Sequence, residues 1–333
     1  MSVEVKIFDQ LADVAEDAGD ALSRGQQPIL YDRMRWFEMT QKHCGNGRTP
    51  LVVRAMQGDS AAWMFLCRTG KRSAEALTSW YTLAFDIVRR GEDRGLIEAI
   101  AGDLGDLARI SLAPMASPAR IVEGFTAAGW KAFVEGSTQN WQLRVPDSFD
   151  AYWAARPGKL RSTVKRKAKK ANLEIRIHRA FDEDAWADYQ AIYAESWKPE
   201  EGSWDFMRDF VTEEGEAGSL RLGIAYQEGR PVAAQLWHVE NGHATIHKLA
   251  YAESAKSHSP GSILGEAMFR HVIEEDRPAT IDYGTGNEPY KADWMDAPRP
   301  LYRIELFNPR QPAAWAPLLK RKLSALVRRS ATD

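Results

Sequence analysis

Cysteine is scarce in this sequence, which contains only Cys44 and Cys67 among its 333 residues. Two cysteines cannot build a disulfide framework or a cysteine-ligated zinc site, so we expect both to be reduced packing residues. The sequence also lacks an excess of either positive or negative charge. The formal net charge is only −2, and the molecule as a whole has no field that attracts nucleic acid or anionic lipid. No nucleic-acid partner is therefore expected.

Long apolar runs and targeting patterns are also missing. No apolar stretch has the length needed to cross a bilayer, and residues 3–20 are acidic, unlike a secretory signal. We therefore expect a cytoplasmic protein. The chain has neither a GxxxxGK[ST] loop nor a GxGxxG loop after an N-terminal strand, which argues against a nucleotide triphosphatase and a dinucleotide fold. Its 44% hydrophobic and 27% charged residues predict a globular protein with one large or two medium domains.

Hydrophobic periodicity and turn residues predict a mixed α/β chain in both halves. In the first half, helices are expected at 31–42, 95–107 and 118–128, and strands at 51–57, 61–68, 109–114, 130–135 and 140–145. Glycine-containing turns at 58–60 and 136–137 predict two hairpins. A helical connection follows at 147–172, interrupted at Pro157-Gly158.

The second half has a clearer order. We expect strands at 174–178, 220–226, 232–239, 244–251, 279–283 and 301–307, and helices at 183–197, 203–214 and 263–275. Asn241-Gly242 strongly favours a hairpin turn between two of these strands. The first half shows a looser version of the same order, which suggests a duplicated unit.

The turn at Ser259-Pro260-Gly261-Ser262 precedes a predicted helix and is a candidate phosphate site. The first amides of a helix carry partial positive charge and suit a phosphate or pyrophosphate, to which Lys256 and His258 could add charge. A plain helix cap, with Pro260 setting the turn and Ser262 capping, explains the same residues.

Residues 282–294, DYGTGNEPYKADW, combine glycines, carboxylates, aromatic rings and a lysine in one loop. Glycines free the backbone where a ligand approaches the main chain closely, although an ordinary strand-to-helix turn has the same composition. Histidines at 238, 243 and 247 invite a metal interpretation, but no carboxylate repeats at a compatible spacing, and we expect no metal. A hydrogen-bonded core histidine is favoured for each, with His247 or His238 as a proton acceptor next.

Two basic segments stand out. The helix at 159–170 contains seven lysines and arginines and no acid, and it could follow phosphates or be a solvated face. It lacks the interleaved aromatic rings that stack on single-stranded nucleic acid. The second segment, at 311–333, predicts a basic amphipathic helix that either docks on its own domain or lies on a membrane surface.

Five motifs now carry a family resemblance. They are LRSTVKRKAKKA at 160–171, SWK at 196–198, KLAY at 248–251, SPGSIL at 259–264, and the loop at 282–294. In this order they resemble the BioF2-like/CelD-type branch of the GNAT acyltransferase superfamily, which is related to the Fem-type ligases. The resemblance implies an α/β (α+β) fold of tandem GNAT-like domains, each a mixed, mostly antiparallel sheet flanked by helices. We expect an N-terminal domain at 1–146, a helical connection at 147–172, an acyltransferase domain at 173–310 and the terminal helix at 311–333.

GNAT similarity implies transfer from an acyl thioester, usually acetyl-CoA, which lies between two splayed strands, here 244–251 and 279–283. It implies Tyr290 as the acid that protonates the departing thiolate, with Tyr283 as second choice. The candidate bases, which take the proton of the acceptor amine, are Asp282, Glu288 and His247. Expected coenzyme-binding residues are Ser259, Gly261, Ser262, Lys248 and Tyr251. Expected substrate-binding residues are Trp197, Lys198, Lys291, Trp294 and Tyr283.

The resemblance leaves the substrates open. The turn lacks the family's usual (Gln/Arg)-x-x-Gly-x-(Gly/Ala) pattern, so acyl carrier protein and aminoacyl-tRNA remain alternative acyl donors beside acetyl-CoA or another acyl-CoA. No permanently bound cofactor is expected. The acceptor is an amine or hydroxyl on a small molecule or on a cell-envelope polysaccharide, lipid or precursor. Such an acceptor would place the enzyme in the cytoplasm at the inner face of the membrane, in peripheral contact with it. The alternatives are Fem-type aminoacyl transfer to a peptidoglycan precursor and a non-catalytic binding module.

Overall fold

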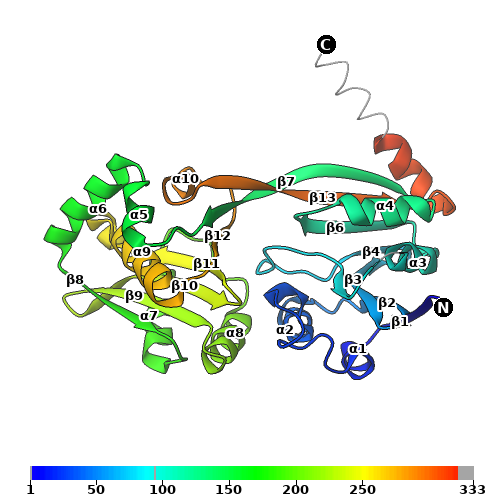
Figure 1. Ribbon diagram of the computed structural model, residues 1–333, viewed down its shortest axis with the longest axis horizontal. Coiled ribbons are helices and arrows are strands. Elements are labelled where there is room, and N and C mark those ends of the chain that lie inside the picture. Colours follow the sequence, from blue (N-terminus) through cyan, green and yellow to red (C-terminus); the bar gives the residue numbers. More distant parts are fainter. Residues whose placement is uncertain (1, 94, 322–333) are drawn as a thin grey trace, which may run out of the picture. The chain divides into compact units, whose positions relative to one another are not determined.

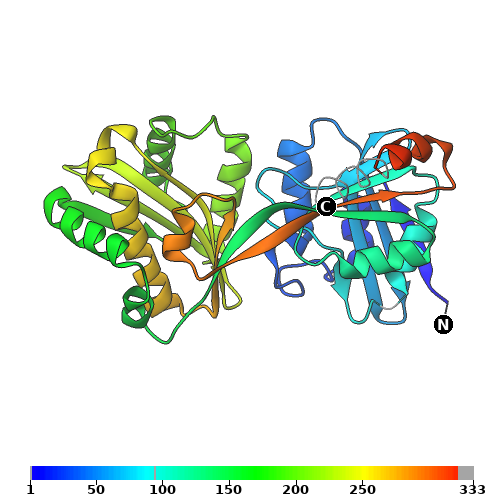
Figure 2. The same ribbon diagram turned by 90° about the horizontal axis from the view of Figure 1, so that it is seen from above.

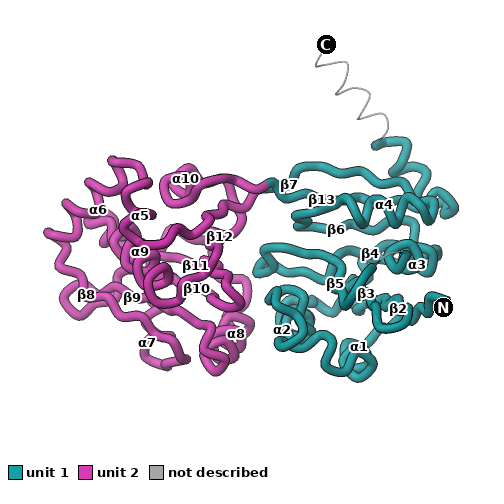
Figure 3. The backbone as a smooth tube through the Cα atoms, viewed as in Figure 1, with its two compact units in different colours: residues 1–138, 300–333 teal, residues 139–299 magenta. Residues whose placement is uncertain are grey.

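The computed structural model describes residues 2–93 and 95–321, and within them the chain forms two compact units. Unit 1 combines residues 1–138 with 300–333, and unit 2 is the continuous segment 139–299 (Figure 3). The predicted boundary at 146 and the predicted placement of 301–307 differ from this division. The reason is that the last strand pairs with a strand of the first half, and such pairing is not encoded in local sequence.

Unit 1 is a mixed sheet with helices packed on it (Figure 1). Its strands are β1 (Glu4–Phe8), β2 (Pro50–Gln57), β3 (Ser60–Gly70), β4 (Ser73–Ala76), β5 (Val88–Arg90), β6 (Arg109–Met115) and β13 (Ala297–Phe307), which reaches it from unit 2. Its helices are α1 (Leu11–Ala18), α2 (Met34–Cys44), α3 (Leu96–Asp103) and α4 (Ala119–Ala127). The strand order is β1-β2-β3-β4-β6-β13, with β5 beside β3. All these pairs are antiparallel except β4 with β6.

Unit 2 repeats this arrangement (Figures 1 and 2). Its strands are β7 (Lys131–Arg144), which begins in unit 1, β8 (Leu173–His178), β9 (Leu220–Gln227), β10 (Arg230–Glu240), β11 (His243–Tyr251) and β12 (Thr280–Thr285). Its helices are α5 (Phe149–Ala154), α6 (Gly158–Ala171), α7 (Glu183–Ala194), α8 (Trp204–Glu216), α9 (Pro260–His271) and α10 (Lys291–Trp294). The order is β8-β9-β10-β11-β12-β7, antiparallel except for β11 with β12. The expected fold of two mixed, mostly antiparallel sheets flanked by helices is confirmed.

Local sequence explains most of these elements. Asn241 and Gly242 adopt positive φ values of 50° and 74°, as a type I′ hairpin turn requires, and they join β10 to β11 as predicted. The side chains of Asp182 and Ser203 cap α7 and α8 by accepting hydrogen bonds from backbone amides of their first turns. Within unit 2, α6 and α9 contribute to one apolar cluster on one face of the sheet, and α7 and α8 cover the other face (Figure 1).

One predicted hairpin is wrong. The turn expected at Gly136-Ser137 does not form, and a single 14-residue strand, β7, runs through both residues. Gly136 is outside the set of glycines with positive φ, so the chain stays extended there. The predicted helix at 183–197 ends earlier, at Ala194, which leaves Trp197 and Lys198 outside α7.

Part of the predicted C-terminal helix is observed, because residues 315–321 are helical. The rest of the segment at 311–333, from residue 322 onward, lies outside the described residues. Among the helices of residues 2–93 and 95–321, none combines the length and the apolarity that a bilayer crossing requires.

Candidate active site

The two strands expected to splay do part. Strands β11 and β12 pair in parallel at only three positions, His243 with Thr280, Ala244 with Ile281, and Thr245 with Asp282. Beyond the last pair, Leu249 and Tyr251 of β11 and Tyr283 of β12 line a cavity of about 460 Å³. Separated strands leave room for a ligand at the level of the sheet, with backbone amides and carbonyls exposed on both sides.

A β-bulge accompanies the separation. The register between β10 and β11 shifts so that Lys248 pairs with Leu236 and Ile246 with Trp237, which leaves His247 as the extra residue. A bulge releases backbone groups from the ladder and redirects side chains. The buried His247 ring lies 4.9 Å from the ring of Phe210 of α8, outside the cavity lining.

The N-terminus of α9 forms one wall of the cavity. Ser259, Pro260, Gly261 and Ser262 all line it, and Ser259 precedes the helix with a left-handed φ of 56°. No side chain caps this helix end among the described residues. Pro260 has no N–H, and the amides of Ser262 and Ile263 donate to the carbonyl of Ser259. The Gly261 amide and the helix dipole are therefore what this end offers to an anion. Gly261 allows a close approach here, since a Cβ at this position would lie 3.2 Å from Cδ1 of Tyr251.

Gln235 is a cavity residue that the sequence analysis did not single out. This buried side chain donates a hydrogen bond from Nε2 to the carbonyl of Gly261, at 3.3 Å, and accepts one from Nε1 of Trp237, at 2.9 Å. It therefore connects β10 to the first turn of α9. A glutamine in the middle of the apolar strand VAAQLWHV was the available signal, because a buried amide needs specific partners.

Aromatic rings form much of the remaining wall. The structure brings together five expected residues, and the cavity lining includes Trp197, Tyr251, Tyr283, Tyr290 and Trp294. The rings of Trp197 and Tyr251 lie 4.4 Å apart, and those of Tyr283 and Tyr290 lie 5.9 Å apart with an edge-to-face geometry. Burial, together with Glu288 and Tyr251, raises the pKa of Tyr290, so its hydroxyl keeps its proton at neutral pH. The lining also includes Leu160, Lys256 and Asp293.

Three expected lysines lie outside the lining and form an electrostatically coupled group with two glutamates. Lys248 is buried, and its Nζ lies 3.0 Å from Oε1 of Glu201. Burial lowers the pKa of Lys198 to about 8, and the neighbouring charges of Lys248 and Lys291 act in the same direction. Lys198 therefore gives up its proton more readily than an ordinary lysine, although most of it is protonated at pH 7.

Lys291 fastens the loop that carries Tyr290. Its buried ammonium donates to the carbonyl of Thr285 at 2.5 Å and lies 3.1 Å from Oε2 of Glu288. Glu288 is exposed, and although partial burial opposes it, a backbone hydrogen bond and Lys291 hold its pKa below the usual range. Glu288 is therefore ionised at neutral pH, and like Lys291 it lies outside the cavity lining.

Asp282 also lies outside the lining, at the point where β12 leaves β11. Its buried carboxylate accepts hydrogen bonds from the Gly284 amide at 2.7 Å, from Nδ2 of Asn140 at 3.0 Å and from Nε2 of Gln142 at 3.3 Å. Burial nevertheless raises the pKa of Asp282. These contacts join β12 to β7 where the register between the two strands shifts.

One segment of the chain, which contains most of the residues that line the cavity, matches a known protein family. Residues 158–292 match the family model described as the acetyltransferase (GNAT) domain. This segment is therefore similar to GNAT acetyltransferase domains. It includes the separated strands, the start of α9 and the loop up to Ala292, so the expected resemblance to GNAT acyltransferases is confirmed. No curated protein sequence matches the chain significantly.

Solved structures match the fold of nearly the whole chain. The C-terminal domain of a protein assigned as a lysylphosphatidylglycerol synthetase from Agrobacterium fabrum matches with a TM-score of 0.58 and 16% identity, covering 93% of this chain and 95% of that one. A crystal structure of FemX matches with a TM-score of 0.60 and 10% identity, covering 92% and 98%. L-PGS from Bacillus licheniformis matches with a TM-score of 0.54 and 13% identity, covering 84% and 89%. At such identities the likeness establishes the fold alone.

Proposed function

We propose that this protein is an acyltransferase that moves an acyl group, acetyl in the first instance, from an acyl thioester such as acetyl-CoA to an amine or hydroxyl acceptor. The observation that carries the proposal is the cavity of about 460 Å³ between β11 and β12, which has the uncapped start of α9 as one wall. A thioester's extended arm fits between separated strands, and its pyrophosphate fits the amides at a helix N-terminus.

The transfer needs three contributions from the chain. The acceptor nitrogen or oxygen forms a bond to the thioester carbonyl carbon as its proton passes to a base, and the carbon–sulfur bond then breaks. Backbone N–H groups at the edge of the opening between β11 and β12 would stabilise the oxyanion of the tetrahedral intermediate. Tyr290, which lines the cavity and remains protonated, gives its proton to the departing thiolate.

Several groups near the cavity are candidates for the base that takes the acceptor's proton. Asp282, Glu288 and His247 lie outside the cavity lining and would act through water. We add Lys198 to these candidates, because it is adjacent to the cavity residue Trp197 and its pKa of about 8 permits proton uptake at neutral pH. Ser259, Gly261, Ser262 and Tyr251 hold the coenzyme in this proposal, while Lys248 supports β11 beside it.

The reaction takes place in the cytoplasm in this proposal. The acceptor class is a small molecule or an envelope precursor presented at the inner face of the membrane, which the enzyme would contact peripherally. Acyl carrier protein is the alternative carrier of the acyl group. All of these substrate assignments rest on the proposed thioester chemistry.

Aminoacyl transfer from an aminoacyl-tRNA is the second candidate, and one observation favours it. Helix α6, with its seven lysines and arginines between 159 and 170, contributes Leu160 to the cavity lining, and its Lys167 donates to the carbonyl of Ser257 at 2.5 Å. A basic helix beside the cavity suits a polyanionic acyl carrier, whose binding would weaken steeply with added salt.

The deciding experiment measures free-thiol release from acetyl-CoA and longer acyl-CoAs with a panel of amines and sugars as acceptors. We expect acceptor-dependent thiol release by the wild-type chain and a strong reduction in Tyr290→Phe. Binding of aminoacyl-tRNA with transfer of the aminoacyl group, and no thiol release from any acyl-CoA, would establish the second candidate instead. Salt-sensitive binding to nucleic acid or anionic vesicles without any transfer would identify a non-catalytic module.

A further inference from the structure

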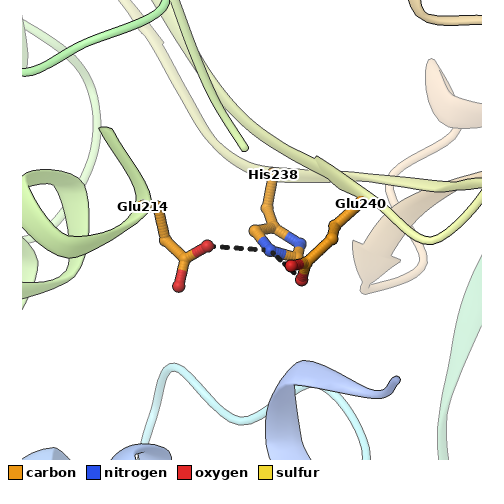
Figure 4. Close-up of side chains that lie close together, drawn as sticks. All are labelled: Glu214, His238 and Glu240. Carbon is orange, nitrogen blue, oxygen red and sulfur yellow. Dashed lines mark ion pairs between the residues drawn. The ribbon is translucent and has the colours of Figure 1, made fainter. Parts of the chain in front are cut away.

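Three potential metal ligands meet away from the cavity, where β10 ends and α8 completes its last turns (Figure 4). They are Glu214 of α8 and His238 and Glu240 of β10. One ligand atom from each lies within 4.8 Å of the other two. Histidine nitrogen and carboxylate oxygen are ordinary ligands of zinc and related divalent ions.

The spacing of these atoms is that of ligands around one ion. Nε2 of His238 lies 3.0 Å from Oε2 of Glu214 and 3.5 Å from Oε2 of Glu240. Two ligands that each lie about 2.0–2.1 Å from a tetrahedral ion are separated from one another by roughly 3.3 Å. The two observed distances bracket this value.

All three side chains are largely buried, and burying two carboxylates without a positive partner costs free energy. The exposed fraction of the side chain is 8% for His238, 2% for Glu214 and 19% for Glu240. Nε2 of His238 is buried and has no hydrogen bond of ordinary geometry among the described residues, although a carboxylate oxygen lies 3.0 Å away. The nitrogen therefore lies close to a carboxylate oxygen of each glutamate. Coordination of a metal ion by the lone pair of Nε2 would give this buried nitrogen a partner.

The surroundings already orient one ligand. The hydroxyl of Ser219 donates to Oε2 of Glu214. The same hydroxyl lies 3.1 Å from the backbone carbonyl oxygen of Glu214, to which it can also donate. Ligating carboxylates in metal sites are commonly held by such hydrogen bonds from neighbouring groups.

We propose that Glu214, His238 and Glu240 bind one divalent transition-metal ion, with zinc as the first choice and water completing the coordination. The ion joins the end of α8 to the β10–β11 hairpin. Two carboxylates and a neutral imidazole balance the charge of a divalent ion. Because β10 also carries Gln235, the site would stiffen a strand that contributes to the cavity. No metal was expected from the sequence, because Glu214 lies 24 positions before His238 and no local spacing connects them.

The competing explanation is a purely ionic cluster. Burial alone would lower the pKa of His238, but the two carboxylates outweigh it and raise the pKa, so a protonated imidazole can sit between them. This alternative predicts no metal affinity beyond that of other surface groups.

The test is a zinc titration of the full chain after treatment with a chelator, followed by calorimetry and by elemental analysis of the dialysed protein. We expect one zinc ion per chain and a higher melting temperature with zinc present. His238→Asn and Glu240→Gln should each weaken zinc affinity by about 100-fold or more, since loss of a direct ligand exceeds the 10–100-fold loss typical of outer partners. Glu216→Gln, at an exposed position of the same helix, is the matched control and should bind zinc as the wild type does.

Cobalt substitution gives a second readout, because coordination by imidazole and carboxylates produces visible absorption bands that a protonated imidazole cannot. Circular dichroism checks that each variant is folded, and Glu240→Gln, at the most exposed of the three side chains, keeps the test valid if His238→Asn does not fold. The proposal is overturned if the wild type takes up no zinc, or if it binds zinc no more tightly than both ligand variants.

Discussion

Thr245 of β11 and Asp282 of β12 form the last parallel pair before the two strands separate. The carboxylate of Asp282 accepts hydrogen bonds from the backbone of Gly284 and from two side chains of β7. The same residue thus ends one pairing and holds β12 to its other neighbour. The opening of the cavity depends on this local exchange of partners.

We predict that Asp282→Ala lowers the free energy of unfolding by about 2–4 kcal/mol, because buried donors lose their shared acceptor. Denaturant unfolding measures the change. Asp282→Asn should retain most of the stability, because Oδ1 of Asn140 has no partner among the described residues and the Asn140 amide can turn to accept a hydrogen bond. An equal loss in the alanine and asparagine variants would show that the charge, not the hydrogen-bond geometry, is what matters.

Tyr290→Phe should lower kcat by about 100-fold while leaving the affinity for the acyl thioester nearly unchanged. The variant keeps the ring that packs against Tyr283 and removes only the proton that the thiolate needs. Thiol release gives kcat, and calorimetry gives the binding constant. Undiminished turnover would remove Tyr290 from the acid role, and weakened binding would assign it to substrate contact.

Gly261→Val should weaken coenzyme binding by about tenfold or more. A Cβ at this position already lies 3.2 Å from the Tyr251 ring, so larger branches must enter the cavity beside the first amides of α9. Calorimetric titration with coenzyme A is the measurement. Gly158→Ala, at a helix start where an added Cβ meets nothing within 4 Å, is the matched control. Equal affinities in both variants would place the phosphate elsewhere.

Lys198→Met should stabilise the protein at neutral pH. The pKa of Lys198 falls from 10.5 to about 8 in the folded chain, so the folded state binds this proton more weakly than the unfolded state does. The cost of charging the partly buried amine is therefore complete below pH 8 and fades as the pH rises from 8 to 10.5.

Stability curves of the wild type and Lys198→Met at several pH values check this sign. We expect the variant to gain roughly 1–2 kcal/mol at pH 7, after allowance for solvent screening, and the gain to disappear near pH 10.5. A constant difference across the pH range would mean that packing, not protonation, separates the two proteins.

Local chemistry made much of unit 2 predictable. The Asn241-Gly242 turn, the helix that starts after Ser259 and the apolar strand before Asp282 each depend on neighbours within a few residues. Eight of the expected site residues line the cavity, and they belong to motifs at strand ends and at one helix start that are visible in the local sequence. They are Trp197, Tyr251, Ser259, Gly261, Ser262, Tyr283, Tyr290 and Trp294.

Non-local pairing was not predictable in the same way. Gly136-Ser137 has the composition of a turn, yet an extended strand passes through it. Gln235 reaches the cavity only because β10 runs beneath α9, and the sequence offered just a polar residue in an apolar run. Likewise, the carboxylate of Glu214 meets His238 across the packing of α8 on the sheet, which no motif records.

Strand β13 has a consequence for how the protein is made. Residues 302–307 pair with β6, and Ile304 and Leu306 belong to the apolar cluster of the first unit. A ribosome therefore releases all of residues 139–299 before it delivers the strand that completes the N-terminal sheet. Until then, the nascent chain carries β6 with one edge unsatisfied, and chaperone protection in that interval would matter more for this half than for the half synthesised after it.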